Sequence, residues 1–81
     1  MPRKPIYRPG EWDLIVRQRR HNLTVRILTL AANGHHDKQI AQLLNYSLYT
    51  IKHWWRQILA RLGARNRTHA VAIAVREGII P

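Results

Sequence analysis

Cysteine is absent from this 81-residue chain, and only four of its residues are acidic. Without thiols the chain has neither disulfide bonds nor thiolate-ligated metal sites. The acids are dispersed, and no nucleophile is paired with a base in a catalytic pattern. Glycine-rich phosphate loops are missing too. We therefore expect no catalytic residues, no cofactor and no small-molecule ligand.

Long apolar runs are also missing. No segment approaches the ~18 apolar residues that a membrane span requires. The N-terminal residues MPRKPIYRPG lack the apolar stretch of a signal peptide, and no recognisable sensor domain accompanies the rest. The expectation is a stand-alone cytoplasmic protein without membrane contact.

The five histidines do not follow a metal-site spacing. His35 and His36 are adjacent in an expected loop, and the other three are scattered over separate elements. Neither an HExxH motif nor a Cys/His pattern occurs. We expect loop and surface histidines and no metal site.

What the chain has in excess is positive charge. It contains 14 lysine and arginine residues, and its formal net charge is +10 at neutral pH. A polyanionic partner would neutralise this charge and relieve the self-repulsion of the folded domain. Charge alone does not distinguish DNA, RNA and acidic membrane surfaces, so the choice depends on the pattern of residues.

The pattern predicts two parts. Prolines at positions 2, 5 and 9 favour an extended segment, and residues 11–20 have a helical pattern. Residues 1–21 therefore form a basic arm, partly extended and partly helical, in which Trp12 packs on the body or the arginines follow phosphates. Residues 22–81 form the second part, a domain of short helices.

Capping residues divide this domain into four helices. Asn22 is a candidate cap of the first, which Asn33-Gly34 ends, and His36 or Asp37 caps the second. The third runs from about residue 48 to 62 after the cap Ser47, and the fourth covers about 66–77. Short connections between four helices predict an all-α bundle with a basic N-terminal extension.

Residues 37–62 fit a helix-turn-helix. The small Ala41 allows two helices to cross closely, and the Asn45-Tyr46-Ser47 turn sets their angle. The apolar contacts expected at the crossing come from Ile40, Leu44, Tyr46, Ile51 and Trp54.

The third helix is amphipathic. At 100° per residue, one stripe contains Ile51, Trp55, Ile58 and Leu62. We expect this stripe to face the core, together with Trp54 at its border. The opposite stripe contains Tyr49, Lys52, His53, Arg56 and Ala60. Basic side chains on this stripe suit a surface that enters the major groove, where lysine, arginine and histidine can donate to guanine.

These residues resemble the LuxR/GerE-type helix-turn-helix domain. The resemblance covers residues 28–80 and includes Lys38, Ile40-Ala41, Thr50-Ile51-Lys52, Leu62-Gly63 and Asn66-Arg67. It implies a four-helix transcription-regulator domain that binds double-stranded DNA as a homodimer. The implied base contacts are Lys52, His53 and Arg56, and the implied DNA backbone contacts are Lys38, Ser47 and Thr50. We add Tyr49, on the outward stripe, as a further backbone contact. Trp54, Gln57 and Gln39 depart from the family's usual His, Asn and Glu.

In the fourth helix, Ala70, Val71, Ala74 and Val75 are expected to face the core. The other face contains the expected dimer interface, which consists of His69, Ala72, Ile73 and Arg76. The alternative for Ile73 is a lone exposed apolar residue, which is common on protein surfaces.

The leading hypothesis is a sequence-preferring regulator that places its third helix in the major groove and is associated with the nucleoid. One alternative is an adaptor that binds RNA polymerase, similar to region four of a sigma factor. Another is a basic protein that coats the nucleoid or binds RNA.

Overall fold

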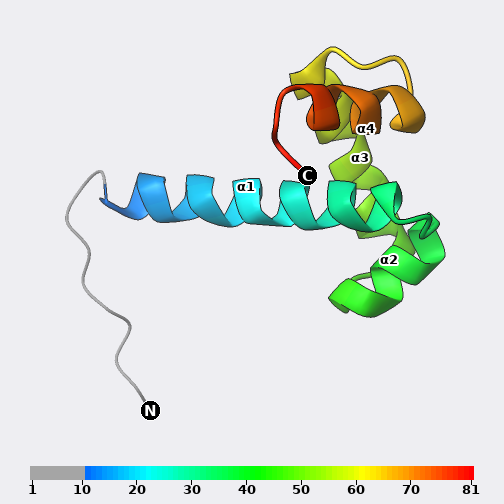
Figure 1. Cartoon of the computed structure of the whole chain (residues 1–81). Coiled ribbons are helices and arrows are strands. Elements are labelled where there is room, and N and C mark those ends of the chain that lie inside the picture. The colour runs from blue at the N-terminus through cyan, green and yellow to red at the C-terminus, as the bar shows by residue number, and fades with distance from the viewer. Residues whose placement is uncertain (1–10) are drawn as a thin grey trace.

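A computed structural model describes residues 11–81 of the chain, with side chains from residue 21 onward. This part forms four helices and no strand, which confirms the all-α prediction. Figure 1 shows α2, α3 and α4 gathered around the C-terminal half of α1. The helices are α1 (Glu11–Ala32), α2 (Asp37–Leu44), α3 (Leu48–Leu62) and α4 (Arg67–Arg76).

The first helix differs from the prediction. α1 is one continuous helix of 22 residues, so the expected helix start at Asn22 is wrong. No glycine or proline interrupts the sequence between Glu11 and Ala32, and an exposed asparagine costs an established helix only a few tenths of a kcal/mol, about 0.7 at most. The N-terminal half of α1 extends beyond the other helices (Figure 1). The predicted extended arm and the packing of Trp12 lie outside the described residues.

The turn between α2 and α3 is as expected. Asn45 adopts the left-handed conformation with φ of 60° and ends α2. The amide of Tyr46 then donates to the carbonyl of Ala41 at 2.9 Å. Ser47 caps α3, because its Oγ accepts a hydrogen bond of 3.1 Å from the amide of Thr50. Three residues thus redirect the chain from one helix to the next.

The other helix ends are also defined by local hydrogen bonds. His36 precedes α2, and its amide donates to Oε1 of Gln39 at 3.2 Å, so this glutamine provides an acceptor at the N-terminus of α2. Gly63, with φ of 63°, ends α3. Asn66 caps α4 by accepting a 2.8 Å hydrogen bond from the amide of His69.

The core lies where all four helices meet. Ile51, Trp55 and Ile58 are buried, which confirms the inward stripe predicted for α3, and Leu62 is half-buried at its end. Tyr46, which we expected to contact the helix crossing, is 45% exposed and belongs to the turn that follows the left-handed Asn45. The buried residues are Ile27, Leu28, Ile40, Ala41, Ile51, Trp55, Ile58, Ala70, Ala74 and Ile80.

The faces of α4 need a correction. Ala70 and Ala74 are buried as predicted, but Val75 is 49% exposed and Ile73 is half-buried. The centre of the buried face falls between the two alanines, which places Ile73 about 80° to one side and Val75 about 120° to the other. Ile73 is therefore a flank residue rather than an outward one, and Val75 is not part of the core.

A hydrogen-bonded cluster connects three helices beside this core. One carboxylate oxygen of Asp37 accepts from the indole Nε1 of Trp55 at 2.8 Å and from Nη1 of Arg67 at 2.5 Å. The same guanidinium donates to the carbonyl of His35 and lies 5.0 Å from the centre of the Trp55 ring. The start of α2 is thereby fixed against both α3 and α4.

Candidate nucleic-acid interface

The exposed face of α3 contains the basic residues that the sequence singled out. Lys52, His53 and Arg56 are all exposed, while Ile51 and Trp55 on the opposite face are buried. The buried row fixes the rotation of the helix about its axis. Two cations and an imidazole consequently extend from one side of a helix that is itself held by α2 and α4.

The N-terminal end of α3 adds polar donors to this face. The hydroxyls of Ser47 and Thr50 lie 2.9 Å apart and share one hydrogen bond. Whichever hydroxyl donates this hydrogen bond, the hydrogen of the other hydroxyl stays available for another acceptor. Asn45 and Ser47 are neutral, and the first turn of α3 contains no acid, so the positive end of the helix dipole is not offset there. Such a helix end favours phosphate groups.

Lys38 lies in the first turn of α2 and is exposed. Its neighbour Asp37 does not neutralise it, because the Asp37 carboxylate is bonded to Trp55 and Arg67. Within residues 21–81, this pairing of Asp37 with Arg67 is the one ion pair. In this same range, the exposed cations of α2 and α3 are therefore not in ion pairs, and they can contact an external anion.

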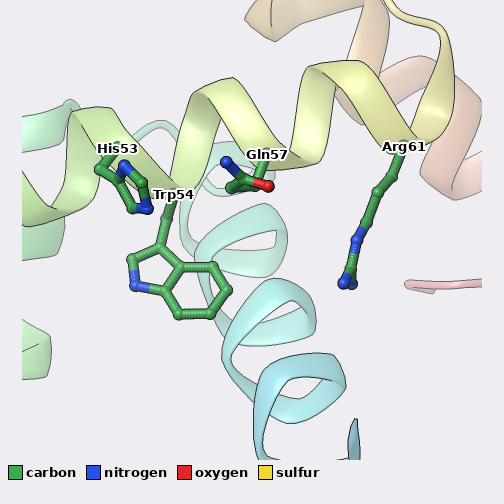
Figure 2. Close-up of a pocket in the computed structure, with 4 residues that line it drawn as sticks. All are labelled: His53, Trp54, Gln57 and Arg61. Atoms are coloured by element: carbon green, nitrogen blue, oxygen red, sulfur yellow. The ribbon is translucent and has the colours of Figure 1, made fainter.

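A hollow of about 290 Å³ lies along the flank of α3, lined by His53, Trp54, Gln57 and Arg61. Figure 2 shows Trp54 and Arg61 extending from the same side of the helix. Gln57 and Arg61 were not selected as site residues from the sequence. Gln57 follows His53 by four residues and Arg61 follows Gln57 by four. This repeated spacing was the signal that could have found them, since it aligns all three residues along one side of the helix. Arg61 also lines a second hollow with His21 and Thr24, so its flank of α3 is directed toward α1.

The residues predicted at a dimer interface lie on α4, away from this surface. Ala72 and Arg76 are exposed, and Ile73 is half-buried. His69 is half-buried, and its Nδ1 accepts a 3.0 Å hydrogen bond from the amide of Arg65. These four residues do share one side of α4, although only two of them are fully accessible.

In the part of the chain that the structure describes, no helix has the length and apolar character needed to cross a membrane. No three histidine or acidic side chains converge there in a way that could hold a metal ion.

In comparison with known proteins, the chain matches a family model. The model of the GerE domain, described as bacterial regulatory proteins of the luxR family, matches residues 22–74. The match therefore begins inside α1 and contains α2, α3 and most of α4. A search of curated proteins finds no match to the chain.

Proposed function

The chain belongs to the luxR family of bacterial regulatory proteins, whose domain binds DNA to regulate transcription, and on that premise we propose that it recognises specific duplex sequences as a homodimer. In this proposal α3 enters the major groove of each half-site. The observation that carries it is the exposed row of Lys52, His53 and Arg56 on the face of α3 opposite the buried Ile51 and Trp55.

These three side chains are proposed to contact bases. Lysine and arginine donate to O6 and N7 of guanine, and histidine can donate to the same acceptors. Their positions at 52, 53 and 56 cover about one helical turn, which matches the few base pairs that a recognition helix reads. Gln57 lies one turn beyond His53, at the edge of this face, and would meet the flanking backbone.

The backbone contacts are proposed at the edges of the same surface. Ser47 and Thr50 keep one hydroxyl donor at the start of α3, and Lys38 is an exposed cation on α2. The phenol hydroxyl of Tyr49 can also donate to a phosphate oxygen. Contacts of this kind fix the register of the protein on the duplex but carry no sequence information.

The homodimer is proposed to form through α4, by two-fold packing of the side that contains His69, Ala72, Ile73 and Arg76. Two copies related in this way would present their α3 helices to half-sites about one helical turn apart. The protein would then act on the nucleoid in the cytoplasm, where a regulator at a promoter also meets RNA polymerase.

The test is a selection of bound duplexes from a random pool, followed by titrations of Lys52→Ala and Arg56→Ala on the selected sequence. Each substitution is expected to weaken binding about tenfold and to relax the preference at one base pair per half-site. Arg26→Ala is the matched control, because it removes the same charge from an exposed position on α1. This control is expected to lower the binding affinity slightly, and by the same factor for every duplex.

Three results would contradict the proposal. The first is wild-type affinity of both α3 variants for the selected duplex. The second is structured RNA outcompeting duplex DNA at matched salt, since the narrow major groove of A-form RNA does not admit a helix. The third is capture of RNA polymerase by the monomeric protein, combined with poor affinity of that monomer for duplex DNA on its own.

The dimer has a separate prediction. Ala72→Arg places a cation against its own symmetry mate, so we expect it to reduce binding to a two-half-site duplex about tenfold while affinity for a single half-site stays unchanged. The measurement is a pair of titrations on the two duplexes. Ala32→Arg, at an exposed alanine of α1, tests for a general effect of added charge. Equal loss on both duplexes would argue against α4 as the interface.

A further inference from the structure

Tyr49 has the most exposed large side chain among the hydrophobic residues that the structure describes, with 81% of its surface accessible. The fold does not need this ring. The start of α3 is capped by Ser47 and Thr50, and the core facing it is filled by Ile51 and Trp55. A single exposed apolar residue is common on protein surfaces, so whether this ring has a partner outside the fold depends on where it lies.

The ring lies on the middle line of the proposed recognition face. Seven residues separate Tyr49 from Arg56, which is about two helical turns, so both extend in nearly the same direction. Lys52 and His53 lie on either side of this line, one turn further along α3. Tyr49 thus faces the same groove as the base-reading residues, at the end of α3 where a recognition helix typically meets base edges.

Only one base presents an apolar group in the major groove, and that group is the 5-methyl of thymine. We propose that the ring of Tyr49 reads this methyl group at a fixed position in each half-site, adjacent to the bases contacted by Lys52 and His53. The inference rests on the proposed function and adds a base identity to it. The hydroxyl at the far end of the ring remains free for the phosphate contact proposed above.

Deoxyuridine provides the test, because it lacks the methyl group and keeps every hydrogen-bonding group of thymine. Each thymine of the selected duplex is replaced singly by deoxyuridine, and binding of the full chain is titrated. Removal of one methyl contact is expected to weaken wild-type binding about fourfold at one thymine per half-site. Replacement at the other thymines is expected to have no effect.

Variants assign this methyl effect to the ring. With Tyr49→Ala the thymine and deoxyuridine duplexes are expected to bind equally, whereas Tyr49→Phe keeps the ring and should keep the fourfold difference. Tyr46→Ala is the matched control, since it truncates an exposed tyrosine of the neighbouring turn that lies outside α3. This control should also keep the difference.

The outcomes separate this inference from the proposed function. If a preferred duplex is selected but tolerates deoxyuridine at every position, the methyl contact is wrong and the proposed function stands. If the effect of the methyl persists in Tyr49→Ala, or is lost in Tyr49→Phe, the ring of Tyr49 is not the reader. If no duplex is preferred over random sequence, the proposed function fails and this inference fails with it.

Discussion

Ile51→Ala is expected to lower the free energy of unfolding by about 2–5 kcal/mol, whereas Lys52→Ala, at the next position, changes it by less than about 0.5 kcal/mol. Ile51 is fully buried where α3 meets the other helices, so its truncation leaves a cavity. Lys52 is exposed and removes no packing. A domain of this size has about 4–12 kcal/mol of stability in total, so the first loss is severe.

The measurement is urea unfolding followed by helical circular dichroism, together with DNA titration at a temperature where both variants are folded. Ile51→Ala should shift the unfolding midpoint and leave the intrinsic affinity of the folded fraction nearly unchanged. Lys52→Ala should do the reverse. Ile51→Val is the graded control, with an expected loss of about 0.5–1.5 kcal/mol.

The comparison of Ile51→Ala with Lys52→Ala tests the rotation of α3 about its own axis, on which the proposed interface depends. If Ile51→Ala left stability unchanged while Lys52→Ala unfolded the protein, the two faces of the helix would be exchanged. The basic row would then be directed into the fold, and the groove-binding proposal would have no surface to act through. Adjacent positions make the comparison stringent, because both variants introduce alanine into the same turn of α3.

Local signals explain what the sequence predicted well. Ser47 as a cap, Asn45 in a left-handed turn and the buried row of α3 each depend on residues within a few positions of one another. Caps and helical periodicity are short-range properties, so they can be inferred from one sequence. The exposure of Lys52 and Arg56 follows directly from the same periodicity.

The errors occurred where distant packing decides the outcome. Asn22 was expected to cap a helix, but α1 continues through it because nothing at that position requires the helix to end. Val75 was expected in the core and Ile73 outside it, although the four-residue spacing of the buried alanines in α4 places Ile73 on the flank and Val75 about 120° from the centre of the buried face. A ten-residue helix has several apolar residues, and only its partner selects which of them are buried.

The cluster around Asp37 was also beyond sequence reasoning. Its hydrogen bonds to Trp55 and Arg67 span 18 and 30 residues along the chain. Asp37 was seen only as a candidate cap for α2, and Arg67 only as part of a family motif. No local pattern indicates that one carboxylate oxygen accepts from two different helices. This contact nevertheless fixes the start of α2, which carries Lys38, relative to α3.

Asp37→Ala is expected to lower the free energy of unfolding by about 2–3 kcal/mol. The substitution removes the acceptor of the Trp55 indole and leaves the half-buried guanidinium of Arg67 without its carboxylate. Most of this loss comes from the unpaired donors. The ion pair itself is partly solvated, with 27% and 33% of the two side chains exposed, so it contributes little on its own.

Asp37→Asn separates the two contributions, because it keeps an oxygen acceptor for Trp55 and removes the charge; its expected cost is about 1 kcal/mol. Glu77→Ala, at an exposed acid after α4, is the control for loss of a carboxylate and should have almost no effect. In a double-mutant cycle, Asp37→Ala with Arg67→Ala should cost at least about 0.5 kcal/mol less than the sum of the single changes. Additive costs would show that Asp37 and Arg67 stabilise the domain independently, and the coupling of α2 to α4 through this carboxylate would have to be abandoned.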